Sequence, residues 1–143
     1  MTRRRQQFQS VVDAWDRKDL DFILDAMTDD IVWHYFAGIA PPLRGKSEVR
    51  AHLSRFFSSS GETRLRIITH AEDGDRLFIE GVDEVTPKEG AMFFVVYAGV
   101  VEFRGDRISG WRDYGDSGAI KAQRMGEPKP PYLLELAGRA SAP

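Results

Sequence analysis

The sequence predicts one α+β domain, in which helices come first and a meander of strands follows. Apolar residues recur at helical spacing before residue 60, whereas four runs between residues 63 and 114 alternate apolar and polar side chains. The chain has 143 residues, 42% hydrophobic and 29% charged, as is usual for one globular domain. We expect the order ααβαββββ, with a curved antiparallel sheet wrapped around helices as an open cone, at 1–125. A Pro-rich tail follows at 126–143.

Three amphipathic helices are predicted at the start of the chain. The first buries a stripe formed by Phe8, Val11, Val12 and Trp15. Asp19 is a good N-cap for a second, short helix, which ends at Thr28-Asp29-Asp30. The third begins at Gly45 or Ser47, and its buried stripe consists of Val49, Leu53, Phe56 and Phe57.

Five strands are predicted from runs of β-branched and aromatic residues. They lie at 31–36, 63–72, 76–86, 91–103 and 106–114, and a short helix follows at 117–124. Gly74-Asp75 and Gly105-Asp106 mark tight turns between neighbouring strands. Gly81, Gly99 and Gly110 are expected to permit the bends that strong curvature requires.

Composition excludes several functional classes. The net charge of −2 gives no electrostatic reason to expect nucleic acid or an anionic membrane as a partner. Without cysteine, the chain has no thiolate–zinc site or cysteine nucleophile, and it fits a reducing cytoplasm. No apolar run approaches the roughly 20 residues that span a bilayer. His34, His52 and His70 lack ligand spacing, so no metal site is expected.

Two aspartates stand among apolar neighbours in predicted strands. Asp83 shares a strand face with Leu77 and Ile79, and Asp113 shares one with Trp111. A carboxylate in such a place must be paired, hydrogen-bonded or neutralised. We expect the two to lie on adjacent strands and to share a pocket, one charged and one protonated. Acid–base chemistry at neutral pH requires such a difference.

Each candidate also has a purely structural interpretation. Asp113 caps a turn or pairs with a neighbouring arginine, and Asp83 faces solvent near the next turn. Tyr35 and Tyr97 are then core residues whose hydroxyls find partners. The residue pattern by itself leaves both interpretations open.

Three segments carry a resemblance to a known superfamily. A tyrosine loop runs from Tyr35 through Pro41-Pro42 to Gly45, Glu-x-Val-Asp stands at 80–83, and Gly-Trp-Arg-Asp-Tyr stands at 110–114. With the order of elements, they resemble the nuclear transport factor 2-like (NTF2-like) superfamily, which has a cystatin-like cone. Its members include ketosteroid isomerases and SnoaL-type polyketide cyclases. The segments are most similar to limonene-1,2-epoxide hydrolases.

This resemblance implies hydrolysis without a cofactor or a covalent intermediate. Asp113 matches the base that activates a water molecule, Tyr35 matches a residue that holds this water, and Asp83 matches the acid that protonates the epoxide oxygen. The pocket is expected to bind a small lipophilic molecule. The expected wall residues are Trp33, Ile79, Tyr97 and Trp111.

Assembly follows from the same resemblance. Members of the superfamily often dimerise through the outer face of the sheet, so we expect a homodimer. The apolar run Tyr132-Leu133-Leu134 of the tail is expected to pack, either over the pocket or against the other subunit.

The chain departs from the epoxide hydrolase pattern at two positions. Gly81 stands where the family has an arginine between the carboxyls, and Ala37 stands where it has a water-holding asparagine. Without the arginine, two facing carboxyls are expected to hold one shared proton. Arg64 or Arg66 on the preceding strand is a candidate to reach into the gap.

Three functions from different classes follow. The first is a cofactor-independent enzyme that hydrolyses a lipophilic epoxide. The second is an isomerase or cyclase, in which an aspartate abstracts a proton next to a carbonyl and a donor stabilises the enolate. The third is a domain that binds a small ligand without catalysis.

Overall fold

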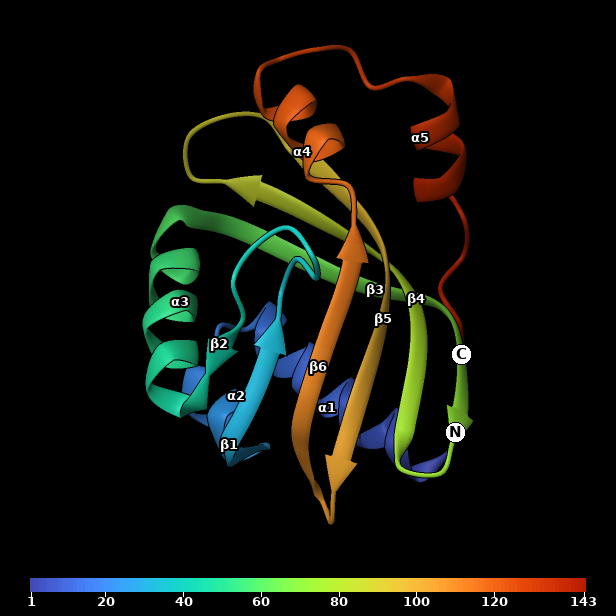
Figure 1. Cartoon of the computed structure of the whole chain (residues 1–143). Helices are drawn as coiled ribbons and strands as arrows, with labels where there is room; N and C mark the ends of the chain where they lie inside the picture. Colours follow the sequence, from blue (N-terminus) through green and yellow to red (C-terminus); the bar gives the residue numbers. More distant parts are fainter.

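The computed structural model describes all 143 residues and contains five helices and six strands (Figure 1). They are α1 (Arg3–Asp16), α2 (Leu20–Asp25), β1 (Met27–His34), β2 (Leu43–Arg44), α3 (Gly45–Ser59), β3 (Ser60–Asp73), β4 (Arg76–Pro87), β5 (Phe93–Arg104), β6 (Arg107–Gly115), α4 (Ser117–Arg124) and α5 (Pro131–Ala137). The predicted α+β class, with helices at the N-terminus and an open curved sheet, is confirmed. None of the helices combines the length and apolar character needed to cross a membrane.

The strands form one sheet in the order β2-β1-β6-β5-β4-β3. All neighbours are antiparallel except β1 and β6, which pair in parallel, so the sheet is mixed rather than wholly antiparallel. The register shifts between Ile67 and Thr69 of β3 and between Glu102 and Phe103 of β5. Such irregularities increase local twist, and the sheet curves around the helices. Figure 1 shows α1 and α2 behind the sheet and α3 along one side.

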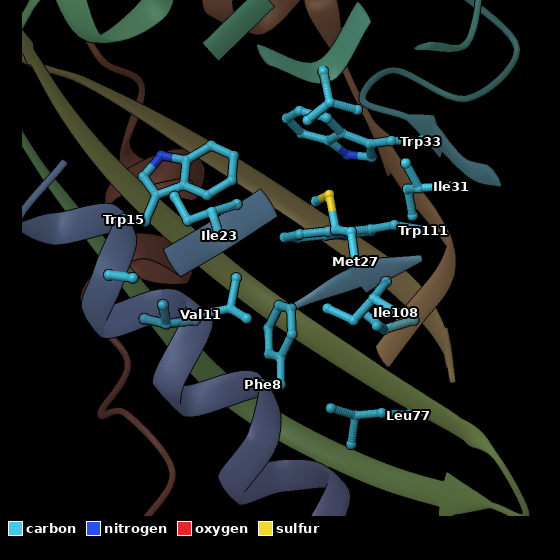
Figure 2. Packing of buried hydrophobic residues seen from close by; sticks show 14 of the residues in the cluster. Phe8, Val11, Trp15, Ile23, Met27, Ile31, Trp33, Leu77, Ile108 and Trp111 are labelled. Atoms are coloured by element: carbon cyan, nitrogen blue, oxygen red, sulfur yellow. The ribbon is translucent and has the colours of Figure 1, made fainter. Parts of the chain in front are cut away.

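Aromatic side chains of the helices and strands fill the hollow of the sheet. Phe8 and Trp15 of α1 point toward the strands, as Figure 2 shows. The ring centroids of Phe8 and Trp111 lie 5.1 Å apart, and those of Trp15 and Trp33 lie 5.6 Å apart. Burying one such side chain contributes about 2–3 kcal/mol. The core that holds the helices against the sheet therefore also fixes the tryptophans around the candidate site.

The structure differs from the sequence prediction at β1. This strand begins at Met27, ahead of the expected start at Ile31, and it ends at His34, so that Tyr35 lies in a turn. The acidic start is tolerated because pairing with β6 is irregular here, and because Asp30 is exposed and pairs with Arg104. The sequence also does not predict β2 and α5, which are too short to show a clear period.

The tail docks on the outer face of the sheet rather than over the hollow. α5 buries Leu133 and Ala137. The guanidinium of Arg66 donates hydrogen bonds to the carbonyl oxygens of Ala137 and Arg139, the latter at 2.8 Å. Arg139 forms an ion pair with Glu80 at 2.9 Å. Arg66 therefore holds the tail and does not reach between the two aspartates.

Candidate active site

An open cavity of about 330 Å³ lies between the helices and the hollow face of the sheet. Of its 19 lining residues, 14 are hydrophobic. The side chains in its wall that can hydrogen-bond or carry charge include Tyr35, His52, Asp83, Tyr97, Asp113 and Arg124. A mostly apolar concavity with a few polar groups is the usual form of a small-molecule site.

The two aspartates come from β4 and β6, with β5 between them. In the register of the sheet, Asp83 lies opposite Val95 of β5, and Asp113 lies opposite Gly99 of β5. The prediction of adjacent strands was therefore wrong. Side-chain alternation nevertheless turns both carboxyls into the same cavity, which Val95 and Tyr97 of the intervening strand also line.

The indole of Trp111 holds the Asp113 carboxyl. The Nε1–H group of Trp111 donates a hydrogen bond of 2.9 Å to Oδ1 of Asp113. Burial raises the pKa of Asp113, and the N–H groups of Trp111 and Trp33 lower it. The effect of burial is larger, so the pKa is raised to about 7. A carboxyl with this pKa is substantially ionised at neutral pH and remains basic enough to accept a proton.

Gly99 leaves the space that this carboxyl occupies. A Cβ atom at residue 99 would lie 2.5 Å from Oδ1 of Asp113 and 3.2 Å from the carbonyl oxygen of Arg112. The predicted role of Gly99 was to permit a bend. Its position shows a second role, because any larger residue would displace the carboxyl of Asp113.

The pKa of Asp83 is perturbed more strongly than that of Asp113. Burial raises its pKa well above the ordinary value, the charges of Asp113 and Asp16 raise it further, and a hydrogen bond with Tyr97 lowers it. Its Oδ1 atom is buried and has no hydrogen-bond partner in the protein. These conditions favour the protonated form of the Asp83 carboxyl.

Tyr97 occupies the space above Gly81. The two residues lie opposite one another in the β4–β5 register, and a Cβ atom at residue 81 would lie 2.5 Å from the Tyr97 hydroxyl oxygen. Burial raises the pKa of Tyr97 well above its ordinary value, as do the charges of Asp83 and Asp113. The hydroxyl therefore stays protonated. Where the resemblance leads one to expect a guanidinium, this chain has a phenolic O–H donor beside Asp83.

Tyr35 and His52 form another part of the cavity wall. Their ring centroids lie 4.3 Å apart, and the His52 ring lies 5.5 Å from Trp33. Burial lowers the pKa of His52, so its imidazole is neutral at pH 7. His52 was not predicted as a site residue. The available signal was its spacing from Val49 and Phe56, which places it on the buried face of α3.

Of the other residues predicted for the site, some line the cavity and one does not. Trp33 and Trp111 line the cavity with Tyr97. Ile79 does not, because it lies two residues beyond Gly81 along β4, where its side chain is buried in the core. Ala37, at the asparagine position of the resemblance, donates its backbone N–H to the carbonyl oxygen of Asp113 at 2.8 Å.

Helix α4 borders the mouth of the cavity. It follows β6 directly and lies at the upper end of the sheet in Figure 1. The Gln123 side chain donates to the carbonyl oxygen of Phe94 at 2.9 Å and accepts from the Phe94 N–H at 2.8 Å. The Gln123 side chain thus makes the two hydrogen bonds that a neighbouring strand would make with Phe94, beyond the end of the β5–β6 pairing. This clamp places Ile120 and Arg124 in the cavity wall.

Comparison with known proteins identifies the fold. An NTF2-like protein of unknown function from Burkholderia pseudomallei is 24% identical, with a TM-score of 0.75 over 87% of this chain and 98% of that one. An LEH-like epoxide hydrolase from M. tuberculosis is 23% identical, with a TM-score of 0.73 over 85% and 88%. A protein with a ketosteroid isomerase-like fold from Catenulispora acidiphila is 20% identical, with a TM-score of 0.75 over 85% and 93%.

At these identities the solved structures show a common fold and not a common activity. No curated protein sequence matches the chain. The SnoaL-like domain family, however, matches residues 8–111, which contain most of α1, all of α2 and α3, and most of the sheet. The chain therefore belongs to the SnoaL-like domain family and has the NTF2-like fold.

Proposed function

We propose that this chain is a cofactor-independent enzyme that opens a lipophilic epoxide by direct attack of water. The observation that carries the proposal is the pair of carboxyls in one apolar cavity, each perturbed differently. The pKa of Asp113 is about 7, and burial raises that of Asp83 well above its ordinary value. One base and one acid are thus available at the same pH. The motifs shared with limonene-1,2-epoxide hydrolases support this reaction class.

The reaction divides the work between the two carboxyls. Asp113 accepts a proton from water while the water oxygen attacks an epoxide carbon. The C–O bond breaks, and Asp83 gives its proton to the departing oxygen, which yields a diol. The Tyr97 hydroxyl stabilises the carboxylate that forms at Asp83. Return of the proton from Asp113 to Asp83 restores the starting state. Tyr35 and His52 orient the water or the substrate from their part of the cavity wall.

A second candidate function is supported by the Tyr97–Asp83 pair. Two neighbouring O–H donors facing a carboxylate base are suited to proton abstraction next to a carbonyl, because the donors stabilise the enolate oxygen. This arrangement favours an isomerase or cyclase. The two reactions differ in mass balance, since hydrolysis adds one water molecule and isomerisation adds none.

The test uses ¹⁸O-water and a panel of terpene and cyclic epoxides, with mass spectrometry of the products. The wild-type chain should form diol with one ¹⁸O, and Asp113→Asn should form none. A product of unchanged mass would support the second candidate instead. If neither protein changes any member of the panel, the hydrolase proposal is wrong for these substrates.

We also propose a homodimer that forms through the outer face of the sheet. Phe78 and Tyr114 expose 39% and 52% of their surfaces there. Phe78 stands between the buried Leu77 and Ile79, and Tyr114 stands between Asp113 and Gly115 of the cavity wall. Sedimentation velocity tests this proposal. A species of 16.2 kDa at all concentrations would contradict it.

A further inference from the structure

Positively charged side chains surround the mouth of the cavity. Arg124 lines the cavity and also two shallow hollows beside it, which contain Lys88 and Lys121. None of these three cations takes part in an ion pair. Glu89 is the only acidic residue that lines the two hollows. The rim is therefore positive in a chain whose net charge is −2.

Arg124 is positioned despite its exposure. Its guanidinium carbon lies 5.4 Å from the ring centroid of Phe93, which is itself part of the cavity wall. A cation over an aromatic face is held by the ring quadrupole. The neighbouring Gln123 fixes the last turn of α4 through its two hydrogen bonds to Phe94. The guanidinium thus has a defined place at the cavity edge and no protein carboxylate to neutralise it.

The path from the aspartates to Arg124 is short and apolar. Phe93 lies opposite Val85, which is two residues from Asp83 along β4. Two residues of a strand advance about 7 Å. Val85, Phe93 and Val95 line this stretch. A molecule with its reacting carbon near Asp83 can therefore place a second group at Arg124 only if an apolar segment separates the two.

We propose that the site takes amphipathic monocarboxylates, with the apolar body in the cavity and the carboxylate paired with Arg124. The planar guanidinium matches a carboxylate through two parallel N–H···O bonds, and the positive rim attracts anions during encounter. This inference rests on the proposed function for the reaction and adds its substrate class, a lipophilic acid whose epoxide lies away from the carboxylate.

Binding can be measured without turnover, because all three tryptophans of the chain line the cavity. Intrinsic fluorescence is titrated with decanoate and with decanol, which have the same chain and differ in charge. Wild-type protein should bind decanoate about fivefold more tightly than decanol, the upper range for a partly exposed ion pair. Arg124→Gln should remove this preference by weakening decanoate binding. Raising the salt concentration should weaken only decanoate binding.

Lys121→Gln provides the matched control. It removes an equal charge from the same helix, but Lys121 lines an outer hollow and not the cavity, so most of the preference should remain. Equal affinity of the wild-type chain for both probes overturns the inference, as does an equal loss in both variants. Arg124-dependent binding without diol formation from any epoxide would retain the ligand class and refute only the hydrolase proposal.

Discussion

Asp113 and Asp83 differ in the groups that contact them, and this difference assigns their proposed roles. Asp113 accepts a hydrogen bond from the Trp111 indole, which favours the ionised carboxylate, whereas Asp83 has a buried oxygen without a partner and a charged neighbour. No arginine is needed to separate the two pKa values. The Tyr97 hydroxyl beside Asp83 then acts on the carboxylate that forms when the proton leaves.

The pH dependence of the reaction follows from these two groups. Asp113 must be ionised to accept a proton, so kcat/KM for epoxide opening should rise as the pH passes through about 7. It should fall again at higher pH, when Asp83 loses its proton. Initial rates between pH 5 and pH 10 measure the profile. A rate that is constant below pH 7 would show that Asp113 is not the base.

Asp113→Asn should make the protein more stable at alkaline pH. The pKa of Asp113 is higher in the folded than in the unfolded chain, so the folded state binds more protons between about pH 4 and pH 7. Stability therefore falls as the pH rises through this window. One pKa unit corresponds to about 1.4 kcal/mol. Because the cavity is open to solvent, we expect a gain of only about 2 kcal/mol at pH 8. Urea unfolding at pH 8 and pH 4 should show this gain shrinking at the lower pH; equal gains would contradict the assignment.

Gly99→Ala tests the space beside the Asp113 carboxyl. The added methyl group would collide with Oδ1 of Asp113, so the carboxyl must move and diol formation should fall by about 100-fold, the usual contribution of a positioned base. Gly110→Ala is the matched control, because its Cβ would meet Glu102 atoms only at 3.5 Å or more. Similar activity in both variants would contradict the proposed role of Gly99.

Some site residues can be predicted from local sequence motifs, and others cannot. Asp83, Asp113 and Tyr35 stand in motifs, and the structure places all three in the cavity wall. The relation between Gly81 and Tyr97 depends on the register of β4 and β5, which no local pattern contains. The case of His52 is similar. Its helical face was predictable, but its contact with Tyr35 depends on a turn at residues where a strand was predicted.

Among the elements, α4 depends on one side chain for its position. Gln123 satisfies both backbone groups of Phe94, which no strand pairs on that side. Gln123→Leu should leave these groups without partners, at a cost of about 1–3 kcal/mol, and loosen α4. Hydrogen exchange should become faster in peptides that cover 92–96 and 117–124. Lys121→Ala is the control on the same helix, and equal protection in both variants would contradict the clamp.

Periodicity predicts most of the elements, and its failures have physical causes. The strands from β3 to β6 lie close to their expected ranges because each alternates between the hollow and the outer face. β1 was misplaced because its first half contains Asp29 and Asp30, which are typical of a turn, and because its partner β6 is distant in sequence. The parallel pairing of β1 with β6 is a tertiary feature, and alternation within one strand does not specify the direction of its neighbour.

At the scale of the whole molecule, the two faces of the sheet contact different parts of the chain. The hollow face holds the aromatic core and the cavity, while the outer face carries the docked tail. Val82 points to the outer face and is nevertheless fully buried, and we attribute its burial to the tail. A change in the tail should therefore alter stability and leave the cavity intact.

Truncation after Met125 tests this separation. The variant loses the buried side chains of Leu133 and Ala137, and the Arg66 guanidinium loses two carbonyl acceptors while it keeps Glu84 at 2.9 Å. We expect the free energy of unfolding to fall by about 2–3 kcal/mol, with decanol binding to the cavity unchanged. Tyr132→Ala is the control, because this side chain is 74% exposed and should contribute little. Equal thermal stability of the truncated and full-length chains would show that the docked tail adds nothing to the fold, and weakened decanol binding would show that the two faces are coupled.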